Sequence, residues 1–364
     1  MSGFQPARTD APHRYASVDA LRGITVAAML LVNNPGDWGH VFAPLLHADW
    51  HGCTPTDLIF PFFLVIVGVS IGVGVVPRVE QGGNRLALTR TVLVRALRIF
   101  GLGLLLHLLA WWWLDLPHYR PWGVLQRIGL CFAVVGVMAV WLQPRLQWLC
   151  LGVLLGSYAA LLAAGGTLAP WHNLASRVDT ALFGPLLYRY DAGTGLGHDP
   201  EGLLSTLGAL ASTLLGLHAG ALLRSGRPLR LLAAALVLLV AGGVWSHGLP
   251  INKNLWTPTY TLWTAGWAFV ALWLAHQLID RRGWPAWGRR FGVNAITAYA
   301  GSSAMVLAMM ATGAWAWLYT HVFDAAVTPV AGAKAASLAF ALAFVALWWL
   351  AMWWLDRRRI YLKI

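Results

Sequence analysis

Charge is scarce in this 364-residue chain, because Asp, Glu, Lys and Arg together make up only 11% of it. Soluble globular domains hold about 25%, so this scarcity excludes an ordinary soluble domain. Cysteine is also scarce. Cys53, Cys131 and Cys150 are odd in number and widely spaced, so we expect neither a disulfide framework nor a cysteine metal site. The sequence also lacks a Walker-type loop, a dinucleotide fingerprint and a serine elbow.

Apolar residues, by contrast, make up 58% of the chain, and its 22 tryptophans favour the membrane–water interface. Many apolar segments have the length of about 20 helical residues that a bilayer crossing needs. Open sheets cannot satisfy their backbone groups in lipid, so each segment should be a helix. The sequence predicts an all-α polytopic membrane bundle of about ten transmembrane helices, near 18–34, 56–76, 96–114, 123–142, 146–165, 202–223, 229–247, 257–279, 291–311 and 335–355.

The net charge of +12 reflects topology and not a nucleic-acid partner. If the N-terminus is cytoplasmic, 20 of the 26 Lys and Arg residues fall in cytoplasmic segments, as the positive-inside rule requires. The apolar run at 24–32 has no convincing cleavage site after it, so we expect a retained first span and not a cleaved signal peptide. The expected divisions are a cytoplasmic tail at 1–17, a transmembrane domain at 18–355 with external loops at about 35–55 and 166–201, and a basic cytoplasmic tail at 356–364.

The stretch "LLHADWHGCTPTDLIFPFFL", residues 45–64, places several titratable groups at the external membrane edge. His47 and His51 would need a third ligand to bind zinc, and a water-facing interfacial loop is the alternative. Asp57 opens the second span, where a carboxylate needs a partner or water. Its charge would also complement the helix dipole, with Thr54 or Thr56 as a cap.

Two further pairs of polar residues lie at helix ends on this face. Asn33 and Asn34 precede a Pro-Gly pair, which a turn explains, although amides beside a histidine also suit a site that holds a carbonyl oxygen. Gln126 and Arg127 lie just inside the fourth span. An intramembrane arginine needs an anion or a buried partner, so it is a candidate site residue or one half of a structural ion pair.

Three more motifs carry charge. "PINKNLWTP", 250–258, suits recognition of hydroxyl-rich or anionic ligands, and equally a capped turn. "DPEG", 199–202, is typical of a helix start with two acids in the first turn. Asp19 and Arg22, three apart at the start of the first span, are expected to pair with each other or with a neighbouring helix.

Seven blocks, in order along nearly the whole chain, together resemble the heparan-α-glucosaminide N-acetyltransferase family. They are "SVDALRGITVAAMLLVNNPG", "LLHADWHGCTPTDLIFPFFLVIVGVSI", "GVLQRIGL", "DPEGLLSTL", "INKNLWTPTYTLWTAGWAF", "GVNAITAYAGS" and "RRIYLKI". The resemblance implies transfer of an acetyl group from acetyl-coenzyme A in the cytoplasm to a glucosamine-type amine across a bacterial inner membrane. We expect the long luminal domain and first anchoring span of the animal enzymes to be missing here, which leaves the acceptor glycan open.

The resemblance also implies roles for particular residues. The histidine of the H-A-x-W-x-G block, near the periplasmic face, is His47, and the asparagine that ends the first span is Asn33. His51 receives no catalytic role. The expected substrate- and cofactor-binding residues on this side are Gln126, Arg127, Asn252, Lys253 and Asn254.

Acetyl transfer to an amine needs a neutral amine and a polarised thioester. His47 could act as general base or as a transient acyl carrier, and the sequence leaves both routes open. Asp57 would orient the imidazole, and Asn33 would donate to the oxyanion. For the coenzyme A phosphates we expect cytoplasmic cations, for which Arg290, Arg358 and Lys363 are the candidates.

Two other functions remain open on sequence alone. A proton-coupled transporter of a sugar or organic anion would use His47, Asp57 and Arg127 as a gate, and a non-catalytic lipid or assembly protein would bind no coenzyme A. Expected partners are acetyl-coenzyme A, an amino-sugar or glycan acceptor and membrane lipids, with no nucleic acid and no metal. A homodimer is compatible with the family, although no feature of the sequence demands one.

Overall fold

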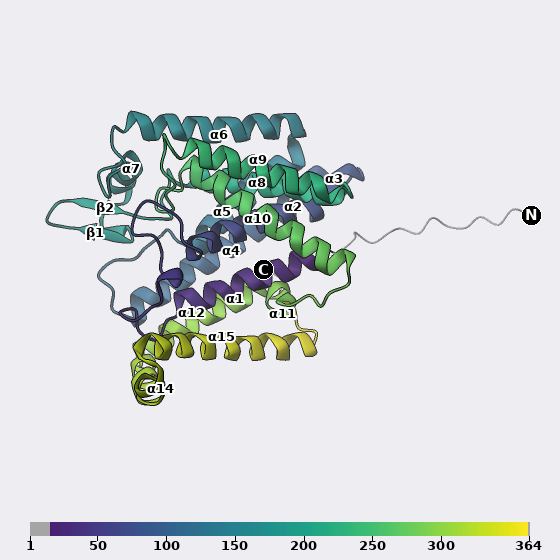
Figure 1. Cartoon of the computed structure of the whole chain (residues 1–364). Coiled ribbons are helices and arrows are strands. Elements are labelled where there is room, and N and C mark those ends of the chain that lie inside the picture. Colours follow the sequence, from purple (N-terminus) through teal and green to yellow (C-terminus); the bar gives the residue numbers. More distant parts are fainter. Residues whose placement is uncertain (1–14, 363–364) are drawn as a thin grey trace, which may run out of the picture.

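A computed structural model describes residues 15–362 of the chain, and Lys363 lies outside this part. The chain forms a bundle of roughly parallel and antiparallel helices with one short hairpin (Figure 1). The α-helices are α1 Ala16–Asn33, α2 Ile59–Gly74, α3 Val76–Glu80, α4 Arg85–Trp113, α5 Val124–Trp141, α6 Pro144–Ala164, α7 Leu174–Phe183, α8 Thr206–Arg224, α9 Pro228–Trp245, α10 Pro258–Ala275, α11 Arg289–Val293, α12 Ala295–Ala311, α13 Ala314–Leu318, α14 Ala325–Ala331 and α15 Ala333–Arg357. The other elements are the 3₁₀ turns η1 Ala43–Leu45, η2 Thr56–Leu58 and η3 Gly184–Leu186, the π-helical turns η4 His276–Arg281 and η5 Tyr319–Asp324, and the strands β1 Arg189–Asp191 and β2 Leu196–His198.

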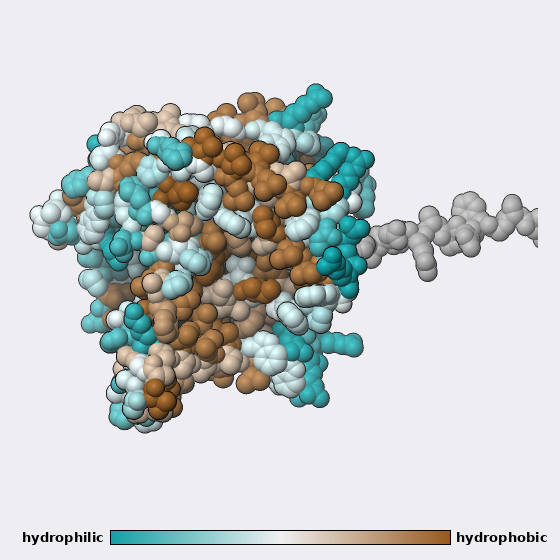
Figure 2. All heavy atoms as spheres, viewed as in Figure 1, coloured by the Kyte–Doolittle hydropathy of each residue, from teal (hydrophilic) through white to brown (hydrophobic). Residues whose placement is uncertain are grey.

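The predicted polytopic bundle is confirmed. Within residues 15–362, nine helices are long and apolar enough to cross a membrane, and a bent pair makes a tenth if it counts as one span. That pair is α12 followed by α13 and α14, with a bend of 88°. Figure 2 shows apolar residues in the middle of the visible face, with hydrophilic residues gathered toward the two ends. This distribution is the one expected of a protein whose middle lies in lipid.

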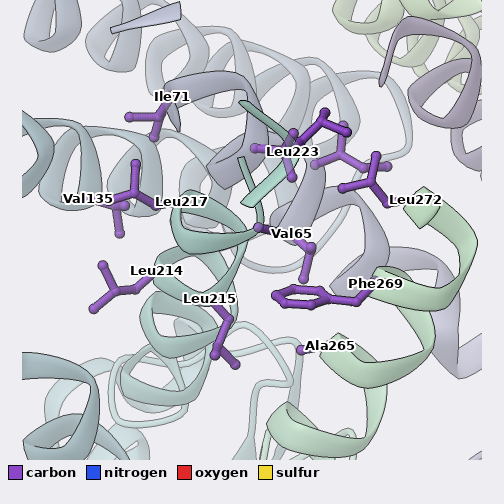
Figure 3. Close-up of a cluster of buried hydrophobic side chains, with 14 of the residues drawn as sticks. Val65, Ile71, Val135, Leu214, Leu215, Leu217, Leu223, Ala265, Phe269 and Leu272 are labelled. Carbon is purple, nitrogen blue, oxygen red and sulfur yellow. The ribbon is translucent and has the colours of Figure 1, made fainter. Parts of the chain in front are cut away.

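Glycines allow α2 and α8 to pack closely against each other. Gly68 on α2 and Gly216 on α8 have no side chains, so the backbone of each lies directly against the partner helix. Small residues of this kind let membrane helices approach closely and replace the hydrophobic driving force that lipid removes. Figure 3 shows the apolar core that surrounds this contact, with Val65 from α2, Leu214 from α8 and Phe269 from α10.

Two predicted spans differ in detail from the observed helices. The segment predicted at 96–114 is the second part of α4, which begins at Arg85 because Asn84 caps it by accepting a hydrogen bond from Ala87 N (3.1 Å). The segment predicted at 291–311 is broken at Asn294. The Asn294 backbone leaves the helical conformation there (φ −124°, ψ 34°). Its side chain donates to Ile360 O (3.1 Å) and accepts from Leu362 N (3.1 Å), which ties this break to the C-terminal segment.

A small polar substructure covers one end of the bundle, the left end in Figure 1, and contains α7, β1 and β2. The strands pair antiparallel with Tyr190 opposite Gly197, a hairpin that the sequence did not predict. The prediction that "DPEG" begins a helix is wrong, because residues 199–205 form an irregular turn and α8 begins at Thr206. At the other end of the bundle, the predicted pair between Arg22 and Asp19 is confirmed at 3.0 Å.

Candidate active site

The loop between α1 and η2 holds the histidine that the sequence singled out. Prolines prevent a continuous helix here, and two threonines fix the loop instead. The Thr54 hydroxyl donates to Leu46 O (2.7 Å), and the Thr56 hydroxyl donates to Pro44 O (3.1 Å). His47 therefore lies on a braced loop at the end of the helix pair α1 and α2.

Asp57 is the partner of His47. Its Oδ1 lies 2.7 Å from His47 Nδ1, and its Oδ2 accepts hydrogen bonds from the backbone N of Ala48 (3.0 Å) and of Thr54 (2.9 Å). A carboxylate only accepts hydrogen bonds, so the proton of a neutral imidazole is on Nδ1 and the lone pair on Nε2. The Asp57 side chain is 1% exposed and that of His47 is 45% exposed, which leaves the imidazole accessible while its orienting group is buried.

Lys253 completes the cluster from the turn before α10. Its Nζ lies 2.9 Å from His47 Nδ1, 3.0 Å from His47 Nε2 and 3.6 Å from Asp57 Oδ1. Burial lowers the pKa of the Lys253 ammonium, and the Asp57 carboxylate opposes that shift. The structure thus brings Lys253 to His47 and Asp57, although Lys253 lies 206 residues after His47 in the sequence.

Asn252 supports the turn that holds Lys253. Its Oδ1 accepts from Leu255 N (2.8 Å), which is a capped turn of the kind that the motif predicts, and its Nδ2 lies 3.2 Å from His51 Nδ1. His51 therefore faces Asn252, while His47 faces Asp57 and Lys253. Asn254 is half-buried in the same turn. Within residues 15–362 no group of three or more His, Cys, Asp or Glu side chains is arranged to hold a metal ion.

Arg127 is buried next to the turn that carries Lys253, with 1% of its surface exposed. Its Nη2 donates to Gly202 O (2.9 Å) and Ser205 Oγ (2.5 Å), and its guanidinium lies 5.3 Å from the centre of the Trp256 ring. Its Nε and Nη1 have no hydrogen-bond partner among the described residues. Arg127 therefore joins the turn at 199–205 to the turn that carries Lys253.

Gln126, although adjacent to Arg127, points elsewhere. It is fully buried, and its Nε2 lies 3.4 Å from His107 Nδ1 on α4. His107 Nδ1 donates to Arg120 O (2.7 Å), so Gln126 belongs to the contact between α4 and α5. The structure does not place Gln126 against His47.

The two asparagines that end α1 have different surroundings. Asn33 is exposed, while Asn34 is buried and donates from Nδ2 to Leu30 O (2.7 Å). Asn34 thus closes the helix, and the side chain of Asn33 is exposed at its end.

The arginines proposed for coenzyme A lie on other elements. Arg290 on α11 lies 5.1 Å from the Trp349 ring, and Arg358 follows α15 and lies 5.9 Å from the Trp354 ring. Arg290 and Trp349 line a surface hollow of about 400 Å³ with Trp287 and Asp356. In Figure 1, α11 and the end of α15 lie away from the end of the bundle that carries the hairpin.

Sequence reasoning missed one charged group of this site. Arg120 binds Asp199 through two hydrogen bonds (Nε to Oδ2, 2.9 Å; Nη2 to Oδ1, 2.6 Å) and Glu201 through one (Nη2 to Oε2, 2.6 Å). The available signal was an arginine on the face that holds few cations, together with two acids that we interpreted as a helix start. Charge alone does not reveal such a pairing, because 79 residues separate Arg120 from Asp199.

Comparison with known proteins bears directly on this arrangement. The family described as "Heparan-alpha-glucosaminide N-acetyltransferase, catalytic" matches residues 14–186, the part that contains Asn33, His47, Asp57 and Arg127. The mouse heparan-α-glucosaminide N-acetyltransferase is 26% identical over 372 residues, which cover 83% of this chain and 55% of the mouse protein. The human protein of that name is 28% identical over 359 residues, which cover 80% of this chain and 53% of the human protein.

The chain is similar to heparan-α-glucosaminide N-acetyltransferases over most of its length, and the catalytic model of that family matches its residues 14–186. It spans about half the length of the curated relatives that it matches. The family match ends at residue 186, whereas the two matches to heparan-α-glucosaminide N-acetyltransferases extend over most of the chain.

Proposed function

We propose that this protein is a transmembrane acetyltransferase that moves an acetyl group from acetyl-coenzyme A to the amine of a glucosamine-type sugar. The observation that carries the proposal is the oriented imidazole of His47. Asp57 fixes its tautomer from a buried position, and its Nε2 carries the lone pair on a side chain that is 45% exposed. The names of the similar mammalian proteins support the reaction class.

In this reaction the amine nitrogen attacks the thioester carbonyl, a C–N bond forms and the C–S bond breaks. The proton that the amine loses goes to Nε2 of His47, which then returns it to the departing thiolate. A covalent route is the alternative within the same proposal. There Nε2 first takes the acetyl group from the thioester, and the amine then attacks the acetyl-imidazole.

Lys253 supplies the positive charge that either route needs. Its ammonium lies 3.0 Å from His47 Nε2, so a carbonyl oxygen presented to Nε2 would lie beside it and the negative charge that develops there would be stabilised. Asn33 is proposed as a second donor to that oxygen, because it is exposed at the end of α1. Asn252 holds the turn of Lys253, and Arg127 holds the turn from below, so both act by positioning.

We propose that acetyl-coenzyme A binds from the cytoplasmic side of a bacterial inner membrane. Its acetyl group would then reach His47 through the helix bundle. Arg290 and Arg358 offer cations beside tryptophan rings, a combination that suits phosphates next to an adenine base. Lys363 retains the same proposed role on sequence grounds.

The test is acetyl transfer from radiolabelled acetyl-coenzyme A to glucosamine and short amino-sugar oligomers by purified protein, with His47→Ala beside the wild type. General-base catalysis is worth about 10²- to 10⁴-fold, so His47→Ala should lose at least that factor. The control His51→Ala should retain most activity, because His51 faces Asn252. A wild type that neither transfers label nor binds coenzyme A would refute the proposal and favour transport of a sugar or organic anion.

A further inference from the structure

Glu201 is one of two glutamates in the chain, and its surroundings are unusual for a carboxylate that is only 13% exposed. Its Oε2 accepts from Arg120 Nη2 (2.6 Å), the same nitrogen that donates to Asp199 Oδ1 (2.6 Å). A carboxylate has room for about four hydrogen bonds. Within residues 15–362 this one bond to Arg120 is the only hydrogen bond that the Glu201 side chain makes.

Asp199, by contrast, has all of its hydrogen-bonding capacity in use. It is fully buried, it holds Arg120 through both oxygens, and it also accepts from Tyr188 N (3.1 Å) and Glu201 N (2.9 Å). Asp57 is likewise 1% exposed and is used by His47 and the loop backbone. Of the three carboxylates in this cluster, Glu201 therefore has an accessible surface and spare acceptor capacity.

Glu201 is connected through Arg127 to the turn that carries Lys253, the partner of His47. Gly202, the next residue, receives a hydrogen bond from Arg127, and the Arg127 guanidinium lies on the Trp256 ring of the turn that carries Lys253. The charges of Glu201 and Lys253 are near enough to act on each other, since each perturbs the pKa of the other. Arg127 adds a buried positive charge whose Nε and Nη1 lack partners in the described chain.

Lys253 lies against His47, and Arg127 and Arg120 are linked to its turn through Trp256 and the 199–205 turn. The carboxylates of Asp57 and Asp199, which offset these cations, already have their oxygens in use. A glucosamine amine is protonated over much of the neutral range and must meet an anion before it can approach. Resting on the proposed function, we infer that Glu201 is the carboxylate that binds the protonated amine of the acceptor and makes the site select amino sugars over neutral sugars.

The chemistry of this role is a charge-assisted hydrogen bond from the ammonium to Glu201 Oε1, while Oε2 stays on Arg120. The neutral hydroxyl of glucose in the same place would form only an ordinary hydrogen bond. Once held, the ammonium passes one proton to His47 Nε2 and becomes the nucleophile. Glu201 therefore acts on acceptor binding and Asp57 acts on the imidazole.

The experiment measures glucosamine and glucose binding by equilibrium dialysis in the absence of acetyl-coenzyme A, and acetyl transfer in a separate assay. The variants are Glu201→Gln, which keeps an oxygen for Arg120, and Glu80→Gln, which removes the other glutamate where it pairs with Arg224. We expect Glu201→Gln to weaken glucosamine binding at least tenfold, to leave glucose binding within twofold, and to raise the KM for glucosamine but not for acetyl-coenzyme A. Glu80→Gln should match the wild type.

The outcomes separate the two proposals. If the wild type transfers acetyl groups and Glu201→Gln binds glucosamine as well as it does, the role of Glu201 is overturned and the transferase stands. If the wild type binds glucosamine in a Glu201-dependent way but transfers nothing, the transferase fails and the recognition role stands. A wild type that neither binds nor acetylates glucosamine overturns both. Unfolding temperatures in detergent check that each variant is folded.

Discussion

The His47 imidazole and the Asp57 carboxylate lie 2.7 Å apart. The histidine side chain is 45% exposed, whereas that of the aspartate is 1% exposed. A buried carboxylate keeps a fixed geometry because the backbone N of Ala48 and of Thr54 also donate to it. The exposed ring consequently has one tautomer and one orientation before any substrate arrives. Such preorganisation is what a general base or an acyl-carrying imidazole requires.

Asp57→Asn should impair both catalysis and stability. An amide cannot accept from His47, Ala48 and Thr54 at once, because one of its two polar atoms is a donor. We expect turnover to fall by about 10²- to 10⁴-fold through loss of the oriented base, with a lower unfolding temperature. Asp49→Asn, at an exposed acid of the same loop, is the matched control. Equal activities of the two variants would contradict the role of Asp57.

Asn33 and Asn34 should respond differently to alanine. Asn33→Ala removes the proposed oxyanion donor from an exposed position, so turnover should fall by about 10- to 10³-fold at unchanged stability. Asn34→Ala removes a buried bond to Leu30 O, so the unfolding temperature should fall instead. Steady-state transfer and thermal unfolding, measured on both variants, distinguish the two roles. Unchanged turnover in Asn33→Ala would remove Asn33 from the mechanism.

Arg127→Lys tests whether Arg127 positions the two turns. A lysine ammonium cannot reproduce the bonds to Gly202 and Ser205 while it also lies flat on Trp256. We expect a loss of about 1.5 to 3 kcal/mol of stability together with weaker turnover. Arg145→Lys, at the start of α6, should be neutral in both assays. A variant with wild-type stability and turnover would show that the turns hold without Arg127.

Two groups of the polar substructure should give opposite pH dependences of stability. Burial raises the pKa of Asp179 to about 6 from the ordinary value of 3.8, so the stability that it confers falls as the pH rises through this range. Burial lowers the pKa of His198 to about 4 from the ordinary value of 6.5, so its contribution is lost as the pH falls through that range. The two effects oppose each other between about pH 4 and 6.

Single variants should therefore show a pH dependence of stability that is cancelled in the wild type. Relative to the double variant Asp179→Asn/His198→Gln, Asp179→Asn alone should become more stable from pH 4 to 6.5, and His198→Gln alone should become less stable. Unfolding temperatures in detergent at several pH values measure this. Parallel slopes in the two single variants would contradict the assignment.

Gly68→Ala should disrupt the contact between α2 and α8. A Cβ at Gly68 would overlap the backbone carbonyl of Thr213, which cannot move without shifting α8. Overpacking of this kind costs about 1 to 3 kcal/mol. Gly74→Ala, in the same helix with open space around it, should be neutral or stabilising. The comparison uses denaturation in detergent, and equal stabilities would show that the helices do not depend on this close approach.

The helices were predictable because lipid imposes one rule on every span. Length and apolarity located α1, α2 and α15, but neither property detects a break such as Asn294, whose side chain bonds the distant C-terminal segment. The hairpin of β1 and β2 escaped prediction for a related reason. Its strands are three residues each and are too short for an alternating pattern to stand out.

The site was partly predictable from local sequence. A carboxylate at the start of a span needs a partner, because an unpaired charge there is energetically unfavourable. His47 is only ten residues from Asp57, so it was the nearest candidate partner. Lys253 was a candidate through its motif at 250–258 and through the family resemblance, but no spacing rule joins it to His47. Arg120 and Glu201 were not proposed as site residues, because their pairing depends on how the 199–205 turn folds.

The cluster around His47 draws on segments that lie far apart along the chain. His47 and Asp57 come from one loop, Arg127 from α5, Glu201 from the turn before α8, and Lys253 from the turn before α10. No contiguous half of the protein contains a complete set. A fragment limited to residues 14–186, although it carries the family's matched region, would present an imidazole with neither Lys253 nor Glu201. The fragment 14–186 and the remainder of the chain, expressed separately, would bring these groups together only by associating in the membrane. Acetyl transfer by the mixture would therefore measure that association.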